Sequence, residues 1–176
     1  MADIGYIALL LALVASIYSA IAFVLGEKGR YQALIESARN SLLAVYGLVS
    51  LSIAALVYAL VTHNFQIEYV ASYSSRDLSL PYVLSALWAG NNGSLLFWAW
   101  LLSLFAAVMM LQKRDVGKEL VPYAAAIIMA TQAFFLITLL WLSNPFQQLS
   151  FIPADGRGLN PLLENPGMII HPPFLL

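Results

Sequence analysis

The sequence predicts an all-α integral membrane protein with four transmembrane helices, its N-terminus outside, and an ordered Pro/Gly-rich external tail. Of the 176 residues, 61% are hydrophobic and only 10% are charged, whereas a soluble domain carries roughly 25% charged residues. Four apolar segments are about 20 residues long, enough for a helix to cross a hydrocarbon layer of roughly 30 Å. Lys and Arg residues gather in alternate loops, which indicates a fixed orientation.

The predicted spans follow one another along residues 1–142, which we interpret as one transmembrane region. They run from Ile4 to Leu25, Leu42 to Val61, Ser94 to Leu111 and Val121 to Leu142. The first segment is too long for the core of a signal peptide and lacks a basic leader, so we expect it to be retained as a span. Pro122 suits the start of the last span, because a proline in the first helical turn removes an N–H that has no partner within the helix.

A short interfacial helix is expected near residues 81–90. The run Pro81–Ala89 is apolar but short, and Gly90–Gly93 interrupts it before the next apolar run begins. Glycine weakens a helix and allows the backbone to turn. One long kinked helix through both runs is the alternative, and the sequence leaves it open.

The basic residues place two loops in the cytoplasm. Loops 26–40 and 112–119 hold Lys28, Arg30, Arg39, Lys113, Arg114 and Lys118. The opposite side carries only Arg76 and Arg157. By the positive-inside rule, the N-terminus, the loop 62–80 and the tail from Ser143 onward then lie outside.

The tail, residues 143–176, is expected to be an external loop that leads into a fifth span. It contains six of the eight prolines, and a loop of this length is costly to order unless it packs against something. A plain surface connector is the alternative. Pro166–Leu176 is too apolar for free solvent, however, and Phe174–Leu176 is typical of the opening of another span. We therefore expect the chain to be a fragment or one subunit of a larger assembly.

His171 is the candidate metal or haem ligand of the tail. Pro172 and Pro173 follow it; each fixes φ, and Pro172 biases His171 toward an extended backbone. A stiff, non-helical support limits the directions of the imidazole, and histidine binds iron as an oriented, neutral ring. A hydrogen-bonded interfacial histidine is the ordinary alternative. His63 lies on the same predicted side and is a candidate second axial ligand, although Val-Thr-His-Asn is also an ordinary helix exit.

Trp88 and Trp98 bracket a second motif, Trp88-Ala-Gly-Asn-Asn-Gly-Ser-Leu-Leu-Phe-Trp98. Its two glycines let the backbone turn sharply or approach a flat ligand closely, and the tryptophans could stack on such a ligand. An aromatic belt that flanks a helix break explains the same residues. The sequence leaves both interpretations open.

Composition and motifs exclude several other functions. A net charge of −1 gives no sign of nucleic-acid binding, and the chain has no cysteine for disulfides or thiolate ligands. No nucleotide-binding glycine pattern occurs. A transporter segment is a competing hypothesis, yet no predicted span carries a charged residue in its interior, where ion-coupled transporters usually place one. A purely structural membrane subunit is the third hypothesis.

Both motifs resemble those of the CcmF/NrfE family, the haem-lyase membrane subunits of cytochrome c maturation. The similarity runs in order along the whole chain and covers the amino-terminal part of the family pattern. It is carried by Trp88-x-Gly90-x-x-Gly93-Ser94-Leu95-Leu96-x-Trp98, Ser143–Phe146, Asp155-Gly156-Arg157-x-Leu159–Leu163, Pro166-Gly167 and Ile170–Pro173, with shorter echoes at Tyr69–Ala71 and Leu80–Tyr82.

The resemblance implies that His171 is an axial ligand of an external haem, supported by Pro172 and Pro173, with a lesser role for Trp88 and Trp98. It also implies a multi-pass protein of the bacterial inner membrane that holds haem at the outer face for thioether attachment to apocytochrome c. The chain would be part of a haem lyase and not catalytic alone. Its implied partners are the haem chaperone CcmE, a CcmH-type subunit and apocytochrome c, besides the lipid bilayer. A second, buried haem b and the haem-receiving WWD segment are expected only beyond Leu176. The general and nitrite-reductase branches of the family are not distinguished, and a natural split subunit stays an alternative to a fragment.

Overall fold

The computed structural model describes residues 1–112, 119–167 and 169. Four of its helices are long and apolar enough to cross a membrane: α1 (Ala2–Gly29), α2 (Gln32–Val61), α5 (Asn91–Leu111) and α6 (Val121–Trp141). Within the described residues, an isolated bridge between Ile67 and Gln148 is the sole β pairing. The predicted all-α class with four spanning helices is therefore confirmed. The predicted ligand His171 and its supports Pro172 and Pro173 lie outside the described residues.

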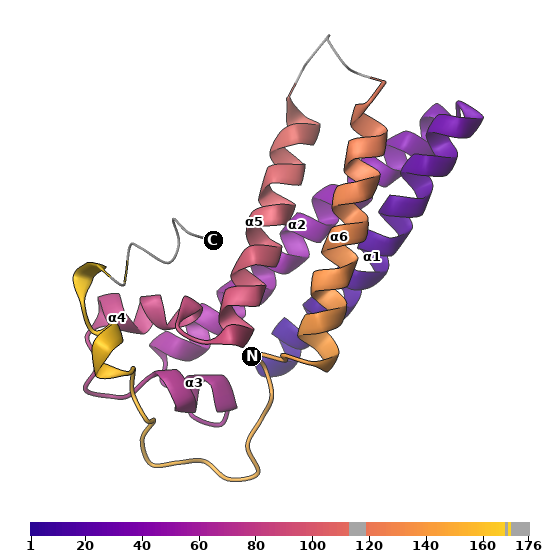
Figure 1. Cartoon of the computed structure of the whole chain (residues 1–176). Helices are drawn as coiled ribbons and strands as arrows, with labels where there is room; N and C mark the ends of the chain where they lie inside the picture. Colours follow the sequence, from indigo (N-terminus) through magenta and orange to yellow (C-terminus); the bar gives the residue numbers. More distant parts are fainter. Residues whose placement is uncertain (113–118, 168, 170–176) are drawn as a thin grey trace.

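The four long helices stand side by side, with the shorter elements gathered at one end (Figure 1). This end contains the N-terminus, α3 (Glu68–Tyr73), α4 (Leu80–Ser85) and the segment that follows α6. The turn between α1 and α2 lies at the opposite end, as does the start of α6. We call the first the loop-rich end and the second the hairpin end.

The helices at the hairpin end are longer than the apolar runs that predicted them. The expected loop 26–40 is mostly helical, and only Arg30 and Tyr31 separate α1 from α2. Arg30 adopts a left-handed conformation (φ 55°), and its N–H donates to the Glu27 carbonyl at 3.2 Å. Charged side chains end the apolar run but do not end the helix, because the backbone hydrogen bonds of a helix also form in its water-exposed turns.

Between α2 and α5, a short helix does form near residues 81–90, as expected, and the loop predicted over residues 62–80 contains a further helix, α3. The sequence did not predict α3, and α4 continues into the 3₁₀ turn η1 (Ala86–Trp88). Gly90 is extended (φ −121°, ψ 161°), and α5 begins directly after it. The chain therefore turns at Gly90 and does not form one long kinked helix. Asn91–Gly93, which we expected to be part of the break, forms the first turn of α5.

Serine hydroxyls link α1 to α2 along their length. The Ser19 hydroxyl donates to the Ala38 carbonyl and the Ser41 hydroxyl to the Ala15 carbonyl, both at 2.9 Å. The buried Ser52 hydroxyl donates to the Gly5 carbonyl at 3.3 Å. Since lipid tails are as apolar as leucine, close packing of small residues and interhelical hydrogen bonds stabilise such pairs.

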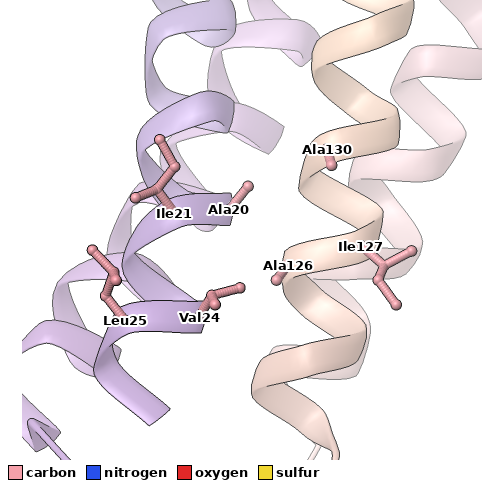
Figure 2. Close-up of a pocket in the computed structure, with 7 residues that line it drawn as sticks. All are labelled: Ala20, Ile21, Val24, Leu25, Ala126, Ile127 and Ala130. Carbon is pink, nitrogen blue, oxygen red and sulfur yellow. The ribbon is translucent and has the colours of Figure 1, made fainter. Parts of the chain in front are cut away.

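An apolar groove runs between α1 and α6 (Figure 2). Its volume is about 430 Å³, and its lining consists of Ala20, Ile21, Val24, Leu25, Ala126, Ile127 and Ala130. Ala20 and Val24 point across the gap toward Ala126 in the close-up. Alanines on both helices leave the space that larger side chains would fill.

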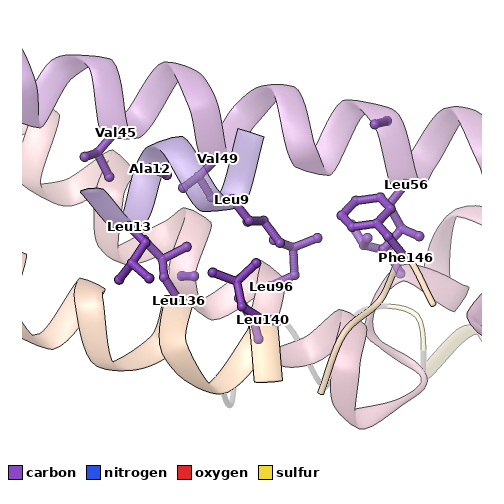
Figure 3. Close-up of a cluster of buried hydrophobic side chains, with 14 of the residues drawn as sticks. Leu9, Ala12, Leu13, Val45, Val49, Leu56, Leu96, Leu136, Leu140 and Phe146 are labelled. Atoms are coloured by element: carbon purple, nitrogen blue, oxygen red, sulfur yellow. The ribbon is translucent and has the colours of Figure 1, made fainter. Parts of the chain in front are cut away.

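The buried core lies between all four long helices and extends to the loop-rich end (Figure 3). Leu9, Val49, Leu96 and Leu136 come from α1, α2, α5 and α6 in turn, and each is fully buried. Phe146, from the segment after α6, is 4% exposed and packs beside Gly5 of α1. The core thereby ties the start of the tail to the helix bundle.

Candidate functional site

The tyrosine of α3 fixes the turn that joins η1 to α5. The Tyr69 hydroxyl lies 2.9 Å from the Ala86 carbonyl, to which it donates, and accepts the Gly90 N–H at 3.1 Å. Burial raises the pKa of Tyr69 far above its usual value. The phenol therefore stays neutral and keeps its proton for the Ala86 carbonyl.

The packing of two tyrosines of α3, Tyr69 and Tyr73, requires glycine at both motif positions, Gly90 and Gly93. A Cβ on Gly90 would overlap the ring of Tyr73, and a Cβ on Gly93 would overlap the Leu87 carbonyl oxygen and the Tyr69 hydroxyl. The Ser94 hydroxyl donates to the Trp88 carbonyl at 3.0 Å. The close approach that these glycines allow is thus occupied by the protein's own side chains and backbone, not by open space for a flat ligand.

Removing the Tyr69 hydroxyl tests whether its hydrogen bonds stabilise the turn between η1 and α5. Tyr69→Phe leaves the buried Gly90 N–H without its partner and removes the bond to the Ala86 carbonyl, so we expect the protein to lose about 1–3 kcal/mol of stability. Tyr73→Phe is the matched control, because the Tyr73 hydroxyl makes no hydrogen bond within the described chain. Thermal unfolding in detergent measures both, and equal melting temperatures for the two variants would contradict this role of Tyr69.

Trp88 and Trp98 belong to separate aromatic contacts. The Trp88 ring lies 5.8 Å from the Phe97 ring, whereas Trp98 meets Phe135 of α6 edge-on at 6.2 Å. Trp98 is 38% exposed. The indole N–H of Trp88 is buried and has no hydrogen-bond partner in the described part of the chain. The structure does not join the two indoles in one stack, and their predicted contact with haem stays a prediction.

The motif Asp155–Gly158 docks on α3 and on the segment that follows it. The Asp155 carboxylate accepts a hydrogen bond from the backbone N–H of Arg76 at 3.0 Å. The backbone N–H of Arg157 donates to the Ala71 carbonyl at 2.7 Å. Gly158 adopts a positive φ of 76° and donates to the Ser74 carbonyl at 3.1 Å. The charged and glycine residues of this motif therefore attach the tail to the rest of the protein.

Further contacts hold the tail on either side of that motif. Glu68 N–H donates to the Gln147 carbonyl at 2.9 Å, and Leu149 N–H donates to the Gln66 carbonyl at 2.8 Å. The Tyr82 hydroxyl donates to the Glu164 carbonyl at 3.1 Å. Between Gln147 and Glu164 the tail is thus tied to α3, to the loop after it and to α4.

A polar cavity of about 230 Å³ lies among α3, the start of α5 and the tail. Its lining comprises Glu68, Tyr69, Ser72, Tyr73, Asn92, Asn144 and Gln147. The cavity is smaller than the roughly 300–1,000 Å³ of typical cofactor pockets, and no imidazole lines it. The described residues also contain no cluster of three or more metal-ligating side chains. This cavity therefore does not fit a haem.

His63, the other candidate ligand, follows α2 at the loop-rich end. Its backbone is left-handed (φ 50°), and its ring lies 5.9 Å from that of Phe65. The Arg76 guanidinium stands over the same Phe65 ring at 5.8 Å. The Nδ1 atom of His63 is buried and has no partner among the described residues. The structure therefore places His63 in an aromatic contact, and its role as a second ligand stays a prediction.

One buried polar side chain was not singled out from the sequence. Gln132 lies in the middle of α6, is fully buried, and neither atom of its amide has a hydrogen-bond partner in the described residues. Within a membrane span an unsatisfied amide is costly. Gln132 is uncharged, so neither the hydropathy of this span nor its lack of charged residues indicates it.

The chain is similar to proteins of cytochrome c biogenesis. Residues 88–176 match the family model described as cytochrome C assembly protein, so the match begins at Trp88. The chain is 35% identical over 176 residues to the cytochrome c-type biogenesis protein CcmF of Haemophilus influenzae, covering 99% of this chain and 27% of that protein. It is 33% identical over 173 residues to the biogenesis protein ccl1 of Rhodobacter capsulatus, with 98% and 26% covered.

Further similarities extend to the NrfE proteins and to a solved structure. The probable biogenesis protein NrfE of Escherichia coli is 37% identical over 152 residues, or 85% of this chain and 27% of that protein. The solved cytochrome c haem lyase CcmF superposes with a TM-score of 0.81 at 22% identity, over 99% of this chain and 27% of that one. The fold is thus shared, and the chain spans about a quarter of the length of these relatives.

Proposed function

Because the chain belongs to the cytochrome c assembly protein family, among its CcmF/NrfE members, we propose that it is part of a cytochrome c haem lyase. In this proposal it helps to hold haem at the outer membrane face for thioether attachment to apocytochrome c. The observation that carries the proposal is the family match over residues 88–176, which contains the structurally explained Trp88–Trp98 and Asp155–Gly158 motifs. In this proposal the chain is not catalytic alone.

The protein is a multi-pass bacterial membrane protein, as its four apolar helices and its bacterial relatives indicate. We propose that the loop-rich end faces the periplasm and the hairpin end the cytoplasm. The excess of Lys and Arg in the loops 26–40 and 112–119 supports this orientation. The N-terminus, α3, α4 and the tail lie together at one end, so they share one side of the membrane in this proposal.

The described residues act as the scaffold of the proposed haem site. His171, the proposed axial ligand, follows Glu164 by seven residues, and the Glu164 carbonyl is bonded to Tyr82. Hydrogen bonds that join Arg157 to α3 and Asp155 to the segment after α3 support the same arrangement. When bound, haem supplies the vinyl groups for thioether formation, while the protein positions it. Pro172 and Pro173 would stiffen the support of the ligand.

The proposed partners follow from the same family membership. They are the haem chaperone CcmE, a CcmH-type subunit and apocytochrome c, which supplies the thiols that this cysteine-free chain lacks. In this proposal the second, buried haem b is held by residues outside this chain. A transporter or a structural subunit without haem would instead give a purified assembly with no haem absorption.

The orientation can be tested with single cysteines, since the chain has none of its own. Ser150→Cys marks the tail and Gln32→Cys marks the hairpin end; both positions are exposed. We expect a membrane-impermeant maleimide to label Cys at position 150 in spheroplasts, and position 32 only after the membrane is disrupted. The reverse pattern would overturn the proposed orientation.

A further inference from the structure

We propose that the polar cavity among α3, the start of α5 and the tail binds a guanidinium group, with the Glu68 carboxylate as its counter-ion. The cavity has a volume of about 230 Å³ and lies at the loop-rich end. It has room for one small ligand group, such as the end of an arginine side chain. The proposal concerns a cationic ligand and does not depend on haem binding.

The lining of this cavity carries a negative charge without a cation to neutralise it. Glu68 is the charged residue of the lining, and the described residues that form it include no Lys, Arg or His. The Glu68 side chain is exposed and makes no ion pair or hydrogen bond within the described chain. Arg76, the closest arginine or lysine in the sequence, stands instead over the Phe65 ring at 5.8 Å. A cation is therefore the class of ligand that the cavity favours.

Unused hydrogen-bond acceptors line the cavity together with this carboxylate. The Asn92 amide nitrogen donates to the Asn144 carbonyl at 3.3 Å, which leaves the Asn92 amide oxygen available. The side chains of Ser72, Tyr73 and Gln147 make no hydrogen bond to the residues that the structure describes. A guanidinium carries N–H donors and no acceptor, so these oxygens match its hydrogen-bonding groups.

Two tyrosines in the lining favour a planar organic cation over a metal ion. Tyr69 and Tyr73 both line the cavity, and their ring centroids lie 4.8 Å apart. A guanidinium can pack against an aromatic ring while its N–H groups reach a carboxylate. Calcium takes roughly 6–8 oxygen ligands, with Asp or Glu carboxylates among them. A lining with a single carboxylate suits the organic cation better.

Hydrogen bonds between the elements hold the walls of the cavity in place. The Glu68 N–H donates to the Gln147 carbonyl at 2.9 Å, which joins α3 to the tail beside the cavity. The Asn144 side-chain oxygen accepts the Phe146 N–H at 2.9 Å, and Phe146 is itself buried beside α1. The backbone of the site is therefore fixed before a ligand enters, which lowers the entropic cost of binding.

Ligand-observed NMR titration of the full-length protein in mild detergent tests the charge of the ligand. The probe is N-acetyl-arginine amide, and N-acetyl-citrulline amide is the control ligand, because its side chain has nearly the same shape and no charge. We expect the arginine compound to bind about fivefold more tightly, the upper end for an exposed ion pair. The difference should shrink as salt is added, since salt screens exposed charges. Equal affinities for the two compounds at low salt would overturn the proposal.

Two variants test whether this binding occurs in the cavity. Glu68→Gln keeps the length of the side chain and should lower the affinity for the arginine compound to that for the citrulline compound. Asp77→Asn removes an exposed carboxylate that does not line the cavity, so the affinity should stay unchanged. Unchanged binding by Glu68→Gln would overturn the proposal. Calcium binding that is tighter than that of the arginine compound and is lost in Glu68→Gln would overturn it as well.

Filling the cavity and lengthening the probe complete the test. Ser72→Phe places a ring in the lining and should remove binding, whereas Ser150→Phe adds the same ring at an exposed position of the tail and should not. Full binding by Ser72→Phe would overturn the proposal. Acetyl-Gly-Arg-Gly amide distinguishes two sources of the same group: tighter binding than the arginine compound supports an arginine within a polypeptide, and equal binding supports a small guanidinium compound.

Discussion

Replacing His171 by alanine in the complete assembly is expected to abolish maturation of cytochrome c and to remove the haem held at the outer face. An axial imidazole contributes directly to iron binding, and even outer-shell partners of metal ligands typically change affinity or activity by about 10–100-fold. We therefore expect a loss at least as large. Haem-stained cytochrome c from whole cells and the haem content of the purified assembly measure it.

His63→Ala is the informative comparison, because His63 is the other histidine of this chain. Its ring lies in an aromatic contact with that of Phe65. If His63→Ala removes the external haem as completely as His171→Ala, the two residues act as a pair. If His171→Ala retains wild-type haem content and maturation, the assignment of His171 is wrong.

Gly156→Ala is expected to detach the tail from the helix bundle and to lower maturation strongly. A Cβ at this position would overlap the Ser74 carbonyl oxygen and would lie 2.9 Å from the Phe65 ring. A backbone carbonyl cannot rotate away as a side chain can, so the overpacked variant should lose about 1–3 kcal/mol of folding stability. Limited proteolysis of the tail should accelerate, while the protein still reaches the membrane.

The control for this variant is Gly167→Ala in the same tail. Among the described residues, an added Cβ at Gly167 meets only the Asn165 side-chain oxygen, at 3.4 Å, so we expect near wild-type proteolysis and maturation. Equal proteolysis of the two variants would show that docking at Ser74 does not order the tail.

The spans could be predicted from the sequence because lipid imposes long apolar segments, and all four appear as α1, α2, α5 and α6. The ends of these helices could not be predicted, because hydropathy indicates where the membrane ends and not where the helix ends. The six residues of α3 were missed for another reason. Helices this short are marginal alone, and here Tyr69 hydrogen bonds to Ala86 and Gly90 hold α3 in place through contacts distant in the sequence.

The motifs were found from the sequence, but their structural roles were not. Gly90 and Gly93 suggested a close approach to a flat ligand, and the structure shows that the approaching groups are Tyr73 and Tyr69. The Asp155–Gly158 motif gave no indication of its partners, because its hydrogen bonds reach Ala71, Ser74 and Arg76 across about 80 residues of sequence. Long-range pairing of loops leaves no periodic signal to read.

Chemical rescue of His171 tests the central claim most directly. The His171→Gly variant of the complete assembly should lose the absorption of the external haem, and added imidazole should restore that absorption together with part of the maturation activity, because free imidazole can replace the missing ligand. A His171→Gly assembly whose haem spectrum equals that of the wild type before imidazole is added would contradict the claim.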